Sequence, residues 1–379
     1  MSKTIYLDYA AATPMDGEVF AAMRPYFTDK FHNPSATYLA GRAARRSLEE
    51  MRGRVAAHLG CRSAEVIFTA GATEANNLAI QGVMRAFPEG EILVSAVEHE
   101  SVLAPARLFT NHEIAVNKNG ILDLDDLKKK IGPRTVLISV MYVNNEIGSI
   151  QPLKEITQLV ADIRRTRLTA SDKTPLYLHT DAAQAGNFFD LHVARLGVDL
   201  MSINGGKLYG PKQSGALFVK AGTRLQPLVV GGGQEFGYRS GTENLAAIAG
   251  FAKAMDESQA VKKDEFDRLM RLRKEFESSL LQQIPQAVIN GGKHRAPHIV
   301  SVSLPGHDNE RLMMQLDEAG IICAVGSACS ASRDEPSHVL AAIGLSEEDA
   351  RSTLRFSLGR QTTEEDLHQT VKVLTSLLK

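Results

Sequence analysis

Short apolar runs alternate with amphipathic stretches through the first two thirds of the chain. Runs typical of buried strands occupy residues 66–69, 92–95, 135–143, 175–179 and 198–202. Apolar residues at helical spacing fill 40–59, the stretch through Leu78, Ile80 and Val83, and 153–164. Strands that alternate with helices predict an α/β fold, with a mostly parallel central sheet and helices on both faces.

The last third of the chain has a different pattern. Residues 244–283 are helical, rich in charge and free of proline, and we interpret them as a connection between two domains. Strands are expected at 299–304 and 354–358, and a helix at 310–319. The final helix opens with a capping box, Thr362 to Glu365.

These patterns predict a division of the chain into two domains. The large domain spans 15–255 and contains the alternating strands and helices. A smaller α+β domain combines 256–379 with residues 1–14, where 5–8 form a short strand.

Polar side chains follow the five predicted strands of the large domain. They are Thr73, His99, Asn145, Asp181 with Gln184, and Lys207, in chain order. In open parallel sheets, ligands bind beyond the carboxyl ends of the strands. We therefore expect a single site assembled from five segments.

Lys207 lies in a glycine-rich turn, 201–212, between the apolar runs 198–201 and 216–219. A lysine held away from water between buried strands can act as an amine nucleophile or form a Schiff base, because desolvation disfavours the ammonium. The alternative is a solvated lysine in an ordinary turn. The polar residues at the other strand ends favour the reactive lysine.

The set suggests pyridoxal phosphate as the cofactor. Lys207 would hold its aldehyde carbon as an imine, and Asp181 would keep the ring nitrogen protonated. The turn formed by Gly71, Ala72 and Thr73 offers backbone N–H groups and a hydroxyl to the phosphate at a helix start. His99 could stack on the ring and exchange protons, and Gln184 could donate to the phenolic oxygen.

Each of these residues also has a purely structural interpretation. Thr73 could cap a helix, Asp181 could cap a turn, and His99 could be a satisfied polar residue at a strand end. Their joint placement favours the cofactor site.

Several motifs, in order from Tyr6 to Arg360, resemble the cysteine desulfurases of the NifS/IscS type. The matching stretches are Phe68 to Glu74, Glu98-His99, Val143 to Gly148, Asp181 to Gln184, Lys207 to Lys212, Arg239 to Thr242, and Gly326 to Cys329. These proteins belong to the class V aminotransferase family. The resemblance implies the fold of a fold-type I pyridoxal-phosphate-dependent transferase, with a smaller domain that carries a mobile cysteine loop.

The resemblance also assigns roles to residues outside the strand ends. It implies that Cys329 accepts sulfur, that Arg355 clamps the substrate carboxylate, and that Asn145 holds the substrate or the ring oxygen. Thr242 would reach the partner subunit's phosphate, so a homodimer is implied. The implied activity converts L-cysteine to L-alanine and leaves a persulfide on Cys329, for iron–sulfur cluster assembly or another sulfur-transfer pathway.

The chain departs from the family pattern just before the lysine. Family members usually carry a serine where this chain has Asn204 and a histidine where it has Gly206. Both normally contact the cofactor phosphate. We expect Ser202 and Asn204 in the cofactor cradle, whereas Gly206 offers only backbone, so cofactor affinity should be lowered.

Two alternatives to a desulfurase remain open from the sequence. One is a cofactor-poor, non-catalytic relative that serves as a sulfur relay or an assembly partner, which the departures at Asn204 and Gly206 favour. The other is a related pyridoxal-phosphate lyase or aminotransferase, which the presence of Cys329 disfavours. A structural role suits Cys61 and Cys323 better than Cys329, because small polar residues surround Cys329.

Composition adds limits on partners and location. Of 379 residues, 44% are hydrophobic and 23% charged, and the net charge of −1 gives no reason to expect nucleic acid or an anionic membrane as partner. The first residues lack the apolar core of a signal peptide, and three cysteines fit a reducing cytoplasm. The spacing of Cys323 and Cys329 matches no common zinc motif, and we expect no metal. A sulfur-acceptor protein is expected, and the sequence does not identify it. The chain ends at Lys379 without the longer tail of many members that deliver sulfur to an iron–sulfur scaffold, so the sequence does not single out such a scaffold.

Overall fold

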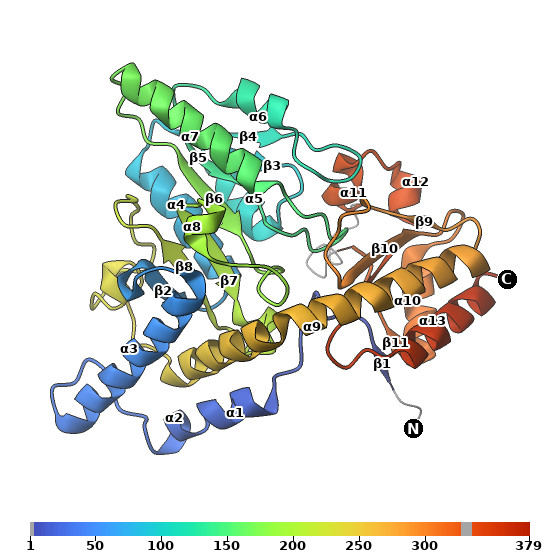
Figure 1. Ribbon diagram of the computed structural model, residues 1–379, viewed down its shortest axis with the longest axis horizontal. Helices are drawn as coiled ribbons and strands as arrows, with labels where there is room; N and C mark the ends of the chain where they lie inside the picture. Colours follow the sequence, from blue (N-terminus) through green and yellow to red (C-terminus); the bar gives the residue numbers. More distant parts are fainter. Residues whose placement is uncertain (1–3, 327–335) are drawn as a thin grey trace.

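A computed structural model describes residues 4–326 and 336–379, arranged in a large and a small lobe (Figure 1). The large lobe contains a seven-stranded sheet with the order β2-β8-β7-β6-β5-β3-β4. Its strands are β2 (Val66–Thr69), β3 (Glu91–Ser95), β4 (Asn111–Ile114), β5 (Thr135–Ser139), β6 (Tyr177–Asp181), β7 (Leu200–Asn204) and β8 (Gly215–Val219). Only β8 runs antiparallel to its neighbours. The predicted α/β class with a mostly parallel sheet is therefore confirmed.

Helices cover both faces of this sheet. The helices of the large lobe are α1 (Gly17–Met23), α2 (Pro25–Thr28), α3 (Leu39–Leu59), α4 (Ala72–Ala86), α5 (Glu100–Ala106), α6 (Leu124–Lys130), α7 (Leu153–Thr169) and α8 (Val193–Leu196), with the 3-10 turns η1 (Ser63–Glu65), η2 (Gly205–Lys207) and η3 (Glu235–Gly237). Of these, α1 and α2 pack against the long helix that follows the sheet. Neighbouring strand residues pack on opposite faces: Ile67 joins a core with α4 and α5, and Phe68 joins a core with α3 and α7. Burial on both faces explains why these strands are continuous apolar runs.

The predicted connection between the lobes is a single helix, α9 (Leu245–Gln283). Asn244 caps its start, because the side chain accepts from the Ala247 N–H. Its first half packs with the core of the large lobe through Ile248 and Phe251, and later residues such as Phe276 join the core of the small lobe. Figure 1 shows α9 running from below the sheet of the large lobe across the small lobe, so one continuous helix joins the two.

The small lobe is an α+β unit, as predicted. Its three-stranded antiparallel sheet has the order β12-β10-β9, and a parallel pair joins β1 to β11. The elements are β1 (Ile5–Tyr6), β9 (Val288–Ile289), β10 (Ile299–Ser303), β11 (Ile321–Ile322), β12 (Thr353–Ser357), α10 (Asn309–Glu318), α11 (His338–Ala342), α12 (Glu347–Ala350) and α13 (Glu364–Leu377). The start of the chain therefore enters the small lobe before the large lobe begins.

Three details differ from the sequence prediction. The capping box of α13 was placed one residue too early, because the reciprocal hydrogen bonds join Thr363 and Asp366. Strand β5 stops at Ser139, and the chain beyond it turns back on itself, pairing Val143 with Ile150. Strand β4 was missed because it is an edge strand with exposed polar residues and no apolar run.

Candidate active site

A cavity of about 200 Å³ lies at the carboxyl ends of the parallel strands, where the two lobes meet. Its walls are formed by Ala10, Ala11, Ala72, Thr73, His99, Ser101, Met141, Val143, Asn145, Asp181, Ala183, Gln184, Asn204, Lys207 and Arg355. The structure thus brings together nine residues predicted from sequence, from both lobes. The five predicted strand ends contribute to one cavity.

Lys207 ends the η2 turn directly after β7. The turn needs glycine at position 205, because a Cβ there would lie 2.1 Å from the Ser214 hydroxyl oxygen. The half-buried Lys207 Nζ donates to the backbone carbonyls of Ala10, at 2.6 Å, and Ala11, at 2.5 Å. The N-terminal segment therefore fixes the position of this amine at the cavity wall.

The β2–α4 turn forms another wall. Gly71 precedes α4 with a φ of 106°, a conformation that favours glycine, and it supplies no side-chain cap. The first backbone N–H groups of a helix have no intrahelical partner. Ala72 and Thr73 therefore present to the cavity a helix start that favours an anion.

Asp181 ends β6 and is 5% exposed. Its Oδ1 accepts from the Ala183 N–H at 2.8 Å, and its Oδ2 accepts from Asn76 Nδ2 at 2.6 Å. The two donors fix the orientation of the carboxyl group. Asp181 therefore caps a turn, which was the alternative role considered for it, and it also lines the cavity.

His99 is the N-cap of α5 and is half-buried. Its Nδ1 accepts from the Ser101 N–H at 3.0 Å and lies 2.8 Å from the Ser101 hydroxyl oxygen. Because a backbone N–H can only donate, Nδ1 carries no proton, and the proton of the neutral ring is on Nε2.

Gln184, which follows β6 of the large lobe, joins it to the small lobe at the cavity wall. Its Nε2 donates to the Ala10 carbonyl at 2.9 Å, and its Oε1 lies 3.2 Å from His298 Nε2. His298 is stacked on Phe188, and burial, then the charges of Arg355 and Arg273, lower its pKa to about 3. The neutral imidazole therefore donates to Gln184 and sets the direction of its amide.

Arg355 reaches the cavity from the centre of β12 and is 2% exposed. One guanidinium nitrogen donates to the Asn145 carbonyl at 3.0 Å, and the other donates to Asp8 Oδ1 at 2.7 Å. A buried guanidinium at a cavity wall is suited to bind a carboxylate.

Three predicted residues lie elsewhere. Ser202 is buried within the sheet and does not line the cavity, because its hydroxyl is paired with His179 Nε2 at 3.0 Å. Thr242 is exposed in the loop between η3 and α9. Cys329 lies outside the described residues. Ala324, which precedes that segment, pairs with Arg355, and Ser337, which follows it, donates to Glu146 at 2.5 Å.

The two departures from the family pattern interact with each other. The Gly206 N–H donates to Asn204 Oδ1 at 3.1 Å. Asn204 lines the cavity, whereas the Gly206 carbonyl accepts from the Thr13 hydroxyl at 3.1 Å. The Gly206 N–H is thus used within the turn, which leaves the Asn204 amide nitrogen as the donor of this pair.

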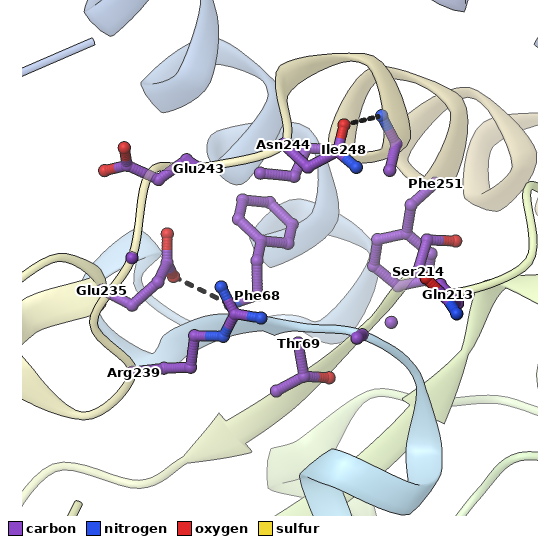
Figure 2. A pocket seen from close by; sticks show the side chains of 14 residues that line it. Phe68, Thr69, Gln213, Ser214, Glu235, Arg239, Glu243, Asn244, Ile248 and Phe251 are labelled. Atoms are coloured by element: carbon purple, nitrogen blue, oxygen red, sulfur yellow. Dashed lines mark hydrogen bonds between the residues drawn. The ribbon is translucent and has the colours of Figure 1, made fainter. Parts of the chain in front are cut away.

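A second cavity, of about 160 Å³, adjoins the other side of the β2–α4 turn (Figure 2). Figure 2 shows Glu235 and Arg239 on one side of Phe68, with Gln213 and Ser214 on the opposite side. The residues that line it include no lysine, histidine or aspartate. It therefore lacks the amine that the first cavity contains.

Comparison with known proteins identifies the family. The model of the aminotransferase class-V family matches residues 5–370. The chain belongs to this family. It is 41% identical to the cysteine desulfurase IscS of Dictyoglomus turgidum, over 100% of this chain and 95% of that protein, and 40% identical to IscS 1 of Archaeoglobus fulgidus, over 99% and 97%.

Solved structures agree with this placement. A NifS-like protein superposes with a TM-score of 0.89 at 29% identity, covering 99% of both chains. SspA, described in complex with cysteine, has a TM-score of 0.80 at 33% identity over 94% of this chain and 99% of its own. The predicted resemblance to NifS/IscS-type proteins is confirmed, and with it a pyridoxal-phosphate-dependent enzyme.

The residues of the class-V site fit this cofactor. A helix start without a side-chain cap suits a phosphate dianion, and a buried carboxylate held by two donors suits a protonated ring nitrogen. Lys207 supplies the amine that an aldehyde requires. All three groups line the same cavity.

Sequence reasoning missed the residues that support these groups. Asn76 and Ser101 contact Asp181 and His99, and Asp8 pairs with Arg355. Asn76 had a recognisable signal, because it is polar yet lies four residues after Ala72 and four before Ile80, on the buried face of α4. His298 and Ser101 stood out in no pattern.

Among residues 4–326 and 336–379, no helix is long and apolar enough to cross a membrane. The same residues contain no cluster of histidine, cysteine or acidic side chains suited to a metal ion.

Proposed function

We propose that this enzyme is a cysteine desulfurase, which takes sulfur from L-cysteine, releases L-alanine and keeps the sulfur as a persulfide. The observation that carries the proposal is the meeting of Lys207 and Arg355 at one cavity, from different lobes. An amine and a guanidinium placed there can engage an α-amino acid at two points. The complex of the similar protein SspA with cysteine supports this substrate.

Arg355 would bind the substrate carboxylate with two hydrogen bonds. Its Nη atoms are aligned by Asp8 and by the Asn145 carbonyl. Because this guanidinium is buried, a carboxylate that reaches it exchanges water for a preformed partner. Asn145, which also lines the cavity, would contact the substrate or the ring oxygen.

The cofactor would be held by groups from several strand ends. When bound, pyridoxal phosphate supplies an electron sink that stabilises negative charge at the substrate Cα. The start of α4 with Asn204 would hold the phosphate, Asp181 the ring nitrogen, Gln184 the phenolic oxygen and His99 the ring face. The residues of this cradle are Ala72, Thr73, His99, Asn145, Asp181, Gln184, Asn204 and Lys207, with Ser202 behind them in the sheet.

Lys207 and His99 would move protons during the reaction. The Nζ of Lys207 takes the α-proton of the substrate and returns a proton to carbon as alanine forms. The backbone carbonyls of Ala10 and Ala11 keep this nitrogen at the cavity wall. His99, with its proton on Nε2, can exchange that proton with groups in the cavity.

Cys329 would accept the sulfur. Its thiolate attacks the substrate sulfur, so that an S–S bond forms while the C–S bond breaks, and the carbon gains a proton to become the methyl group of alanine. Burial raises the pKa of Cys61 and of Cys323 to about 12, which keeps both as unreactive thiols. The segment with Cys329 also begins and ends beside residues that adjoin the cavity, at Ala324 and Ser337.

A homodimer would complete the site. Large apolar side chains are exposed in the N-terminal segment and in the loop that leads to Thr242: Phe20, Phe27, Phe31, Tyr38, Leu39, Val230 and Phe236. These two regions adjoin, because Arg45 and Arg52 of α3 line a cavity with residues 232–236. A second copy would cover this surface and bring Thr242 to the phosphate of its partner.

The persulfide would be passed to a separate acceptor protein in the cytoplasm. The acceptor could serve iron–sulfur cluster assembly or another sulfur-transfer pathway. In either case the acceptor receives the sulfur from Cys329.

Alanine and sulfide release from L-cysteine, with and without added pyridoxal phosphate, tests the activity. We expect equimolar alanine and total released or bound sulfur in the presence of a thiol reductant. Alanine formation from other amino acids, with none from L-cysteine, would contradict the proposal.

A further inference from the structure

A fully buried asparagine of α4 connects two polar residues of the candidate active site. Asn76 is 0% exposed, and its Nδ2 donates to Asp181 Oδ2 at 2.6 Å and to the Ser101 hydroxyl oxygen at 2.8 Å. Both amide hydrogens are therefore used, one by the end of β6 and one by α5. A single side chain fixes these two elements relative to α4.

The chemistry of its partners sets the direction of the Asn76 amide. An ionised carboxylate can only accept hydrogen bonds, so the amide nitrogen must face Asp181. In this orientation Asn76 Oδ1 is buried without a hydrogen-bond partner among residues 4–326 and 336–379. An unpaired buried carbonyl is unfavourable, and a side chain that only filled space here would be apolar. We therefore attribute the asparagine at position 76 to the two N–H groups of its amide.

The hydrogen bonds continue from Ser101 to His99. Because the Ser101 oxygen accepts from Asn76, its own hydrogen can be donated to His99 Nδ1, 2.8 Å away. The result is one directed chain, Asp181–Asn76–Ser101–His99. It joins the carboxylate expected at the ring nitrogen to the imidazole expected at the ring face.

Asp181 carries the negative charge at the cavity end of this chain. A second carboxyl group, that of Glu98, feels the charge of Asp181; it is fully buried and accepts from the Met141 N–H. Burial, with a contribution from the Asp181 charge, raises the pKa of Glu98 well above its ordinary range. Burial thus favours the neutral form of Glu98, and the two donors on Asp181 hold the negative charge there.

We propose that Asn76 is a positioning residue for the cofactor: it orients the Asp181 carboxylate toward the ring nitrogen, and Ser101 keeps the Asn76 amide from rotating. The inference rests on the proposed function in one respect, that the cofactor is pyridoxal phosphate. It predicts that Asn76 strengthens the binding of a cofactor that has the ring nitrogen, and not the binding of an analogue that lacks it.

Cofactor binding tests this prediction without any turnover. Cofactor-depleted parent protein and Asn76→Asp are titrated with pyridoxal phosphate and with its 1-deaza analogue, in which a C–H group replaces the ring nitrogen. Asn76→Asp keeps the shape but replaces the donor with a second carboxyl, which must share a proton with Asp181. We expect the Kd for pyridoxal phosphate to rise at least about tenfold, and the Kd for the analogue to change less than about threefold.

Asn77→Asp is the matched control, with the same chemical change one residue along α4. Asn77 contacts the Thr73 carbonyl and Gln81, not Asp181. Any effect of its added charge on the phosphate falls equally on both ligands. The ratio of the two Kd values should therefore stay at that of the parent protein.

The inference would be overturned if Asn76→Asp raised the Kd of both ligands equally, or if it left the Kd of pyridoxal phosphate unchanged. If this variant fails to fold, Asn76→Ala takes its place, since it removes the donors without adding charge, and the same inequality is expected. Tight pyridoxal phosphate binding without turnover of L-cysteine would contradict the proposed function alone. Failure of the parent protein to bind pyridoxal phosphate would contradict both.

Discussion

Arg355 Nη2 donates to Asp8 Oδ1 at 2.7 Å, which joins the central position of β12 to the segment that follows β1. The Arg355 side chain is 3% exposed and that of Asp8 16%, so the pair is largely desolvated. A buried guanidinium needs such a counter-charge. The residue proposed to bind the substrate carboxylate therefore already has an anionic partner within the protein.

Asp8→Asn should lower the stability of the folded protein. The change leaves the Arg355 charge buried without an ionic partner, which should cost about 1–3 kcal/mol, less than a fully buried pair because Asp8 is partly exposed. Urea unfolding at pH 7 measures this. Asp16→Asn is the control: its partner Arg360 is more exposed, and losing that pair should cost less than about 1 kcal/mol. Equal effects of the two variants would contradict the account.

The stability of the protein should depend on two buried neutral histidines. Burial lowers the pKa of His179 to about 3, and that of His298 also to about 3. The unfolded chain binds these protons below pH about 6.5, whereas the folded protein does not until pH about 3. Stability should therefore be lost as pH falls through this window, by about 1.4 kcal/mol per pH unit for each histidine.

His179→Asn tests this pH dependence. Urea unfolding at several pH values between 6.5 and 4 should show a slope that is shallower by about one proton than in the parent protein. His294→Asn, at an exposed position, is the control for exchanging a histidine for an asparagine outside the core. An unchanged slope in His179→Asn would show that His179 is protonated in the folded protein.

Gly206→His should tighten cofactor binding. A Cβ at this position would lie 3.3 Å from Lys212 Cδ and 3.5 Å from Asn204 Oδ1, so the side chain can enter after a small shift of Lys212. A hydrogen bond to a charged group contributes about 1.5–3 kcal/mol, or roughly tenfold or more in affinity. Titration of cofactor-depleted protein measures the change.

Gly206→Ala adds the Cβ without the imidazole and serves as the control for this prediction. It should leave the affinity near that of the parent protein. Weaker binding in Gly206→His than in Gly206→Ala would mean that this protein satisfies its phosphate without a side chain at position 206.

Sequence patterns predicted which residues meet at the cavity, but not which residues hold them in place. Thr73, His99, Asn145, Asp181 and Lys207 line one cavity, because the segments that follow parallel strands meet at one carboxyl edge of the sheet. Residues that act through other side chains have no such rule. Asp8 meets Arg355 because it follows β1 and Leu7 and pairs with Ser357 of β12, and no local pattern reveals that pairing.

Ser202 lies differently from the expectation that placed it in the cofactor cradle with Asn204. Its hydroxyl meets His179 within the sheet. Strand periodicity could have assigned Ser202 and Asn204 to one face, yet the chain leaves the strand at Asn204. The end of β7 therefore decided which of the two lines the cavity.

Lys207→Ala should abolish alanine formation from L-cysteine. No other lysine lines the cavity among the residues that the structure describes. The visible absorption that reports a covalent lysine–cofactor bond should also disappear, which spectroscopy of the purified variant measures. Borohydride reduction that fixes the cofactor to a different lysine in the variant would show that the amine was assigned wrongly.

Mass spectrometry of the protein after brief exposure to L-cysteine tests the central claim most directly. The account predicts one added sulfur atom on the peptide that contains Cys329, and no added sulfur on it in Cys329→Ser, which should still bind pyridoxal phosphate. An added sulfur found only on Cys61 or Cys323, whose thiols are held unreactive by burial, would contradict it.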